Sequence, residues 1–190
     1  KYIIDSLCYW ASEYHIDGFR FDLMGVLDIE TLNEARKALL KINPDIIMYG
    51  EGWTGGESTL PESERGMKIN APRTPGIGMF SDDIRDAVKG HVFYMDELGF
   101  VNGAADRGEE LKQAVTCAKW AKSPMQSINY LSCHDNYTLW DRFIISNSHE
   151  SEEMRIRMNK LAAAILFTAQ GIPFFLHGEE FARTKISEAD

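Results

Sequence analysis

Residues 17–51, DGFRFDLMGVLDIETLNEARKALLKINPDIIMYGE, decide the fold class of this chain. Alternating apolar and polar side chains over 19–23 predict a short strand. An aspartate suited to capping opens a predicted helix over 28–42, and Pro44 prevents its continuation. The apolar stretch 45–50 is typical of a second, buried strand. Strand, helix and strand with short joints form a βαβ unit, which implies a parallel sheet.

The rest of the chain continues this alternation. Apolar side chains recur every three or four residues in three segments, which predicts helices over 2–14, 107–121 and 151–169. In the last of these helices we expect a buried stripe made of Met154, Met158, Leu161, Ala162, Ile165 and Leu166. Further strands are predicted over 77–81, 127–133 and 172–176, and a long loop rich in Gly, Pro, Ser and Thr over about 52–76.

Three acidic residues each lie at the end of a predicted strand: Asp22, Glu51 and Asp135. A carboxylate at the carboxyl end of a parallel strand contributes little to stability, but such ends open onto the ligand-binding mouth of α/β folds. Asp22 and Glu51 are 29 residues apart. A (β/α)₈ barrel of about 250 residues averages about 31 per unit. The two acids are therefore expected at equivalent points of adjacent units, close enough to act on one ligand.

Composition narrows the function classes. The formal net charge is −9, without a basic cluster, which disfavours nucleic acid as a partner. No apolar run reaches the roughly 20 residues that a membrane helix needs, so we expect no membrane span. Cys8, Cys117 and Cys133 are far apart and lack a C-x-x-C pair, which argues against a disulfide framework and a zinc site.

The chain opens with Lys1-Tyr-Ile-Ile-Asp5, with neither an initiator Met nor a leader-like segment. This start suggests the interior of a longer protein, so the compartment is left open, with the cytoplasm preferred to secretion. The predicted strands number five. Taken alone, they fit either a small open α/β sheet or part of an eight-stranded barrel.

Five segments of the chain resemble the alpha-amylase superfamily of glycoside hydrolases, and most closely type I pullulanases. They match family segments near the fourth to eighth barrel strands, and are in order Gly18-Phe-Arg-Phe-Asp22, Tyr49-Gly-Glu-Gly-Trp53, Phe80-Ser-Asp-Asp-Ile-Arg-Asp86, Asn129-Tyr-Leu-Ser-Cys-His-Asp-Asn-Tyr-Thr-Leu-Trp-Asp141 and Gly171-Ile-Pro-Phe-Phe-Leu-His-Gly-Glu-Glu-Phe-Ala-Arg-Thr-Lys185. The tryptophan after Glu-Gly and the run from His134 to Asp141 favour pullulanases over ordinary amylases. Leu176 and Ala182 are modest departures, and the family's first segment would lie before Lys1.

The resemblance implies an α/β fold that is a partial (β/α)₈ TIM barrel, units four to eight, without the first three strands. Residues 1–190 would then be part of one catalytic domain. A five-stranded arc would expose two strand edges, so we expect this polypeptide alone either to have negligible activity or to hide these edges by self-association. By resemblance Asp22 is the nucleophile, Glu51 is the acid/base, and Asp135 is the acid that stabilises the transition state. The acid/base role calls for a raised pKa of Glu51.

Four further residues are expected to bind substrate. Arg20 lies on the face of its strand that carries Asp22, where its charge would hold that carboxylate ionised. By resemblance His134 and Asn136 would contact sugar hydroxyls. Trp53 would form an apolar wall or a stacking face for a sugar, the alternative being a tryptophan that only packs.

The function implied is a retaining hydrolase that cleaves α-1,6 glucosidic links in pullulan, amylopectin or glycogen. The alternatives are an isoamylase or glycogen-debranching relative, or an inactive fragment that binds glucan. No organic cofactor is needed, because displacement at an acetal carbon requires only acid, base and nucleophile. The resemblance allows a structural Ca²⁺, for which we assign no ligands because no acidic loop has EF-hand spacing. The expected partner is an α-glucan.

Overall fold

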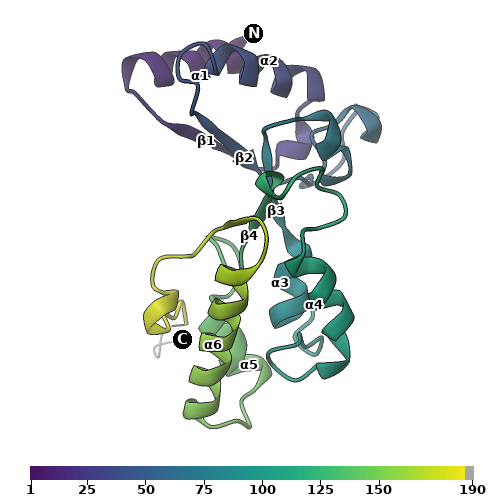
Figure 1. The fold of residues 1–190 in the computed structure, drawn as a ribbon, viewed down its shortest axis with the longest axis vertical. Coiled ribbons are helices and arrows are strands. Elements are labelled where there is room, and N and C mark those ends of the chain that lie inside the picture. The colour runs from purple at the N-terminus through teal and green to yellow at the C-terminus, as the bar shows by residue number, and fades with distance from the viewer. Residues whose placement is uncertain (187–190) are drawn as a thin grey trace. The chain divides into compact units, whose positions relative to one another are not determined.

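The computed structural model describes residues 1–186, which fall into two compact units. Unit 1 comprises Lys1–Phe80 and Lys119–Ile128, and unit 2 comprises Ser81–Ala118 and Asn129–Asp190, described up to residue 186. The α-helices and strands follow one another along the chain (Figure 1) in the order α1 (Tyr2–Glu13), β1 (Gly18–Phe21), α2 (Ile29–Leu39), β2 (Ile47–Gly50), β3 (Gly78–Ser81), α3 (Asp82–Lys89), α4 (Gly108–Val115), β4 (Ser127–Asn129), α5 (Leu139–Ser146), α6 (Glu152–Thr168) and β5 (Ile172–Pro173).

The strands hydrogen-bond in chain order, β1-β2-β3-β4-β5. β1 and β2 run parallel, from Gly18 opposite Ile47 to Phe21 opposite Gly50, and β3 pairs parallel with β2. This confirms the predicted α/β fold with a parallel sheet. The assignment to barrel units four to eight, and to one domain, stays a prediction. Within the described chain β1 has a strand neighbour on one side only, and self-association through it also stays a prediction.

Helix α2 in unit 1 begins as the sequence predicts. The Asp28 side chain accepts the Thr31 backbone N–H at 2.6 Å and its hydroxyl at 2.7 Å. Such a cap contributes about 1 kcal/mol. The buried stripe of the helix includes Leu32 and Leu39, which pack in a core cluster with Met48 of β2. The helix was predicted to extend to residue 42, whereas α2 ends at Leu39 and Ile42 beyond it is exposed.

A buried amide is one of the contacts that hold residues 119–128 in unit 1. Gln126 Nε2 donates to the carbonyls of Ala71 at 2.8 Å and Thr74 at 3.1 Å. These acceptors lie in or next to the 3₁₀ helix Lys68–Arg73, within the segment predicted as a long loop. A second 3₁₀ helix, Glu62–Glu64, interrupts the same segment. The loop is therefore ordered by short turns and by Gln126.

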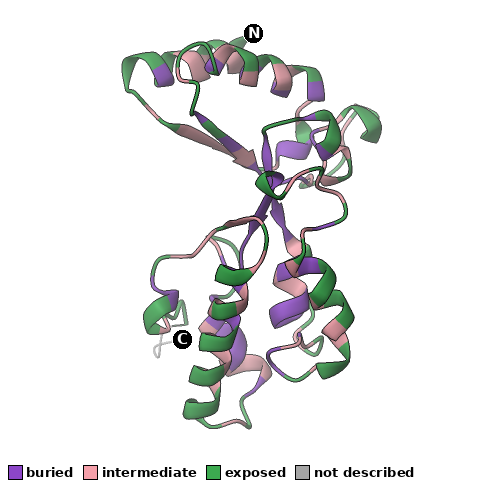
Figure 2. Cartoon of the chain, in the orientation of Figure 1, coloured by how far each residue is buried: buried purple, intermediate pink, exposed green. Residues whose placement is uncertain are grey.

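The core of unit 2 includes two helices that the apolar pattern did not predict, α3 and α5. Its buried members include Ile84 and Val88 of α3, Leu139 and Phe143 of α5, and Leu166 of α6. Both α3 and α5 have eight residues, too few turns for a clear periodicity. Figure 2 shows buried residues in both helices.

Four further predicted elements differ from the structure. The helix predicted over 107–121 ends at Val115, because Cys117 adopts φ +92°. Helix α6 has the predicted extent, yet its proposed core residues Met154 and Leu161 are 39% and 46% exposed, and Figure 2 shows α6 largely exposed. The strands predicted over 127–133 and 172–176 are shorter than expected, at three and two residues. None of the helices in residues 1–186 has the length and apolar character to cross a membrane.

Candidate active site

The two central carboxylates follow adjacent parallel strands. Phe21 pairs with Gly50, and the Glu51 N–H donates to the Phe21 carbonyl at 3.0 Å. Asp22 and Glu51 therefore leave β1 and β2 at the same edge of the sheet. The predicted strand 19–23 stops two residues early, because Leu23 takes a left-handed conformation with φ +43°.

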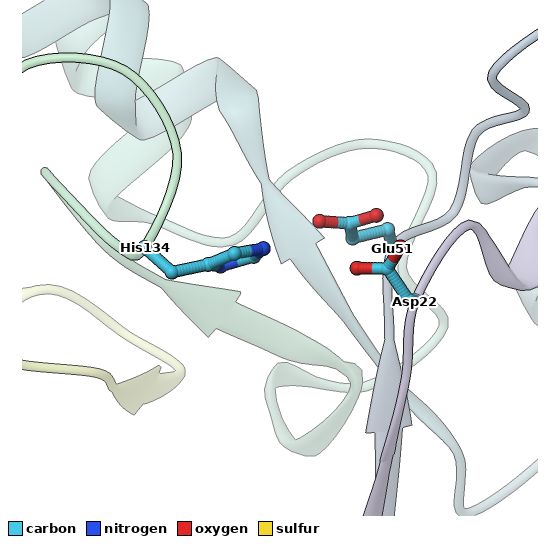
Figure 3. Close-up of side chains that lie close together, drawn as sticks. All are labelled: Asp22, Glu51 and His134. Carbon is cyan, nitrogen blue, oxygen red and sulfur yellow. The ribbon is translucent and has the colours of Figure 1, made fainter.

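Asp22 and Glu51 lie close together, as the sequence predicts. A carboxylate oxygen of one lies within 4.8 Å of a carboxylate oxygen of the other, and Figure 3 shows the two side chains next to each other. Their environments differ sharply. The Asp22 side chain is 63% exposed, whereas Glu51 is 3% exposed. One carboxylate is thus open to a ligand, and the other is enclosed by protein.

Arg20 joins the two carboxylates. One guanidinium nitrogen pairs with Asp22 Oδ1 and another with Glu51 Oε1. Burial on its own lowers the pKa of Arg20, but the hydrogen bond to Asp22 and the charges of Glu51 and Asp22 outweigh it, so this pKa is raised. The guanidinium carbon also lies 5.8 Å from the centre of the Phe80 ring. The predicted contact of Arg20 with Asp22 is present, and the contact with Glu51 was not predicted.

A close approach of strands fixes the position of Glu51. A Cβ added to Gly50 would lie 2.5 Å from the Phe21 carbonyl oxygen, so only glycine fits there. The second Glu51 oxygen, Oε2, accepts the Leu23 backbone N–H at 2.9 Å. Both carboxylate oxygens of Glu51 are therefore hydrogen-bonded, one to Arg20 and one to the turn that follows Asp22.

Trp53 contacts the same turn through its backbone. Its carbonyl accepts the Gly25 N–H at 3.1 Å, and a Cβ on Gly25 would lie 2.6 Å from that oxygen. Trp53 is half-buried, two residues after Glu51. The segment after β2 is thus held against the segment after β1. The stacking of a sugar on Trp53 stays a prediction.

The remaining predicted site residues lie in unit 2, after β4. His134 Nε2 is 3.5 Å from Asp135 Oδ1, and both side chains are more than half exposed. Asn136 follows with φ +57°, a conformation that asparagine tolerates better than most residues. Exposed side chains on a tightly turned backbone are available to a ligand.

One buried acid was left out of the predicted site. Glu179 is 4% exposed, and the Ser132 hydroxyl donates to its Oε1. Burial raises the pKa of Glu179 to about 7, against the Ser132 hydrogen bond and the Lys89 charge, which lower it. Burial likewise lowers the pKa of Lys89 to about 7. The only signal in the sequence was an acid near the end of the last strand, which does not reveal burial.

Fold and site together define an α/β protein with paired carboxylates at the carboxyl ends of parallel strands, an arrangement suited to acid–base chemistry. Among curated proteins, the pullulanase of Bacillus subtilis is 41% identical over 97% of this chain and 27% of its own length. A glycogen operon protein GlgX homolog from Mycobacterium bovis is 26% identical over 96% of the chain. No family model matches the sequence.

Solved structures agree with this similarity. A pullulanase of Anoxybacillus in complex with maltotetraose superposes with a TM-score of 0.94 at 48% identity, over 97% of this chain and 27% of that one. The type I pullulanase of Bacillus subtilis in complex with maltose gives 0.93 at 40% identity. The chain matches pullulanases over nearly its whole length, as a segment that spans about a quarter of the length of these relatives.

Proposed function

We propose that the protein containing this segment is a retaining glycoside hydrolase that cleaves α-1,6 glucosidic links in pullulan, amylopectin or glycogen. The observation that carries the proposal is the convergence of Asp22 and Glu51, with oxygens within 4.8 Å, on the guanidinium of Arg20. Retaining hydrolases hold their two carboxyl groups about 5–5.5 Å apart, whereas inverting hydrolases need about 6.5–9.5 Å to admit a water. Carboxylates whose oxygens approach within 4.8 Å support the proposal of the retaining class.

The two environments suit a division of roles. Asp22, exposed and paired with Arg20, is the candidate nucleophile, because the guanidinium fixes its orientation while leaving it open to a ligand. Glu51, enclosed by protein, is the candidate acid/base, since it must carry a proton in the first step and lose it in the second. A sugar ring would enter from the side where Asp22 is exposed.

The other site residues complete the proposal by resemblance. Asp135 is the candidate transition-state stabiliser, and His134, Asn136 and Trp53 are candidate substrate contacts. The exposure of His134 and Asp135 leaves both available to sugar hydroxyls. A structural Ca²⁺ stays an expectation without assigned ligands.

The proposed substrate class rests on the relatives. Neighbouring pullulanase structures hold maltotetraose, maltotriose or maltose, which supports binding of an α-glucan. Identity to a pullulanase, 41%, exceeds identity to the glycogen operon protein, 26%. The comparisons therefore favour a pullulanase over a glycogen-debranching relative, and they do not favour a fragment that only binds glucan.

The test uses the full-length protein with pullulan, glycogen and unbranched amylose as substrates. We expect hydrolysis of the α-1,6 links of pullulan, with the first product released as the α-anomer in an NMR time course. Asp22→Asn and Glu51→Gln should each lower turnover by at least about a thousandfold, since each removes a group that acts in bond cleavage. Wild-type turnover in either variant, or a β-anomer as first product, would contradict the proposal.

A further inference from the structure

The side chain of Lys185 binds the backbone of the loop that carries His134 and Asp135. Its ammonium nitrogen donates to the carbonyl oxygens of His134 at 2.7 Å, Asn136 at 2.8 Å and Cys133 at 3.4 Å. An ammonium group offers three donors, so these three bonds use its full capacity. Three carbonyls from four successive residues can converge on one cation only if the loop is tightly curved.

The curvature of the loop agrees with this geometry. Asn136 lies in the left-handed region, where a non-glycine residue persists only when its surroundings hold it. Lys185 binds only main-chain oxygens, and the side chains of His134 and Asp135 remain 56% and 60% exposed. The cation thus holds the backbone and leaves the two candidate substrate-binding groups accessible.

A buried carboxylate fixes Lys185 in turn. Asp141 has no exposed surface, and its Oδ2 accepts the Lys185 backbone N–H at 2.8 Å while Oδ1 accepts the Thr184 hydroxyl. Asp141 lies in the first turn of α5, and its own N–H is capped by Thr138 at 3.1 Å. The helix that ends the loop therefore anchors the residue whose side chain binds the middle of the loop.

We propose that Lys185 is a positioning residue, which fixes the backbone of residues 133–136 so that Asp135 and His134 meet the substrate in a set orientation. This inference rests on the proposed function, because the proposed function is what assigns His134 and Asp135 to a substrate-binding site. It also gives a role to Asp141, the last residue of the motif that begins at His134. Lys185 touches no reacting group itself, and its effect on turnover is transmitted through the loop.

The test compares Lys185→Met with Lys185→Arg in the full-length protein, with pullulan as substrate. Since a misplacement of about 1 Å can cost about a hundredfold in rate, we expect Lys185→Met to lower kcat about ten- to hundredfold. Lys185→Arg keeps a charged donor and should recover most of this loss. Lys160→Met, which removes an exposed lysine from α6, is the matched control and should leave kcat unchanged.

A second measurement separates positioning from general destabilisation. Hydrogen–deuterium exchange of a peptide covering 133–138 should be at least about threefold faster in Lys185→Met, with exchange in α6 unchanged, because only the loop loses its anchor. Faster loop exchange with lowered kcat supports the proposal. Loop exchange in Lys185→Met equal to that in Lys160→Met would overturn the proposal. If the wild-type protein hydrolyses pullulan, a kcat of Lys185→Met equal to that of wild type would overturn it as well. If the wild-type protein does not hydrolyse pullulan, the proposed function fails, and the exchange data still decide whether Lys185 holds the loop.

Discussion

The Leu23 backbone N–H donates to Glu51 Oε2 at 2.9 Å, so the candidate acid/base holds the residue that follows the candidate nucleophile. Leu23 is left-handed, with φ +43°, which costs a non-glycine residue about 1–2 kcal/mol. A hydrogen bond makes a net contribution of about 0.5–1.5 kcal/mol and offsets part of that cost. The orientation of Asp22 therefore depends on Glu51 through the backbone as well as through Arg20.

The hydrogen bond from Leu23 to Glu51 predicts different stabilities for two substitutions that both remove the acid. Glu51→Gln retains an oxygen that can accept the Leu23 N–H, whereas Glu51→Ala retains none. We expect both variants to lose turnover, and Glu51→Ala to have a free energy of unfolding lower than that of Glu51→Gln by about 1–3 kcal/mol, the usual cost of an unsatisfied donor. Urea denaturation of both variants in one buffer measures the difference. Equal stabilities would show that the turn does not depend on this bond.

Arg20 provides the second prediction. A lysine at this position has one point charge and cannot hold both carboxylates in the planar fork of a guanidinium. We expect Arg20→Lys to lower kcat at least about tenfold with little change in melting temperature, because it alters geometry and keeps the charge. Arg157→Lys is the matched control, since Arg157 pairs with Glu153 at 2.8 Å on an exposed face of α6. A similar small loss in both variants would contradict a role for Arg20 in orientation.

The pairing of the two carboxylates could be predicted because it depends on few facts. Two apolar segments predict parallel strands, and acids at the carboxyl ends of such strands meet at one edge of a sheet. The register, Phe21 opposite Gly50, completes that arrangement. The bond from Arg20 to Glu51 could not be predicted, because it depends on side-chain reach between strands and not on residue spacing.

The contacts that the sequence did not reveal join distant residues. The lysine at 185 and the loop at 133–136 are about fifty positions apart. Glu179 and Ser132 are likewise remote in sequence, and nothing in either segment marks the glutamate as buried. Helices α3 and α5 were missed because eight residues show barely two turns of apolar periodicity. Local pattern predicts elements, whereas these contacts depend on how the elements pack.

Gly90 provides the third prediction, which concerns stability. Its φ is +85°, and an added Cβ would lie 1.9 Å from the Glu97 carbonyl oxygen. That carbonyl also accepts a hydrogen bond of 2.8 Å from the buried Arg142. We expect Gly90→Ala to lower the free energy of unfolding by about 2–4 kcal/mol, from backbone strain and a displaced arginine.

The control for Gly90 is Gly56→Ala. An added Cβ at Gly56 has nothing within 4 Å, and its φ lies outside the left-handed region. We expect its unfolding free energy to change by no more than about 1 kcal/mol, and the change to be stabilising if anything. Chemical denaturation of both variants measures the contrast. A loss of the same size at both positions would show that the contact with Glu97 is not responsible.

Glu179 provides the last prediction, which concerns pH. Burial raises the pKa of Glu179 from 4.5 to about 7, so between these values the folded protein binds a proton that the unfolded chain releases. The contribution of Glu179 to folding stability is therefore retained at pH 4.5 and below, and is lost as the pH rises to 7. Glu179→Gln keeps an acceptor for the Ser132 hydroxyl and removes the titration.

We therefore expect the free energy of unfolding of Glu179→Gln, relative to wild type, to increase by about 2–3 kcal/mol between pH 5 and pH 8. Lys89 changes the stability difference in the same direction. The charge of Glu179 raises the Lys89 pKa, so this pKa is lower in Glu179→Gln than in wild type. A lysine with a lower pKa makes the folded state less stable at low pH. Urea denaturation at the two pH values measures the change, with Glu153→Gln, an exposed substitution on α6, as control. If the difference between Glu179→Gln and wild type does not vary with pH, Glu179 is not a buried titrating group.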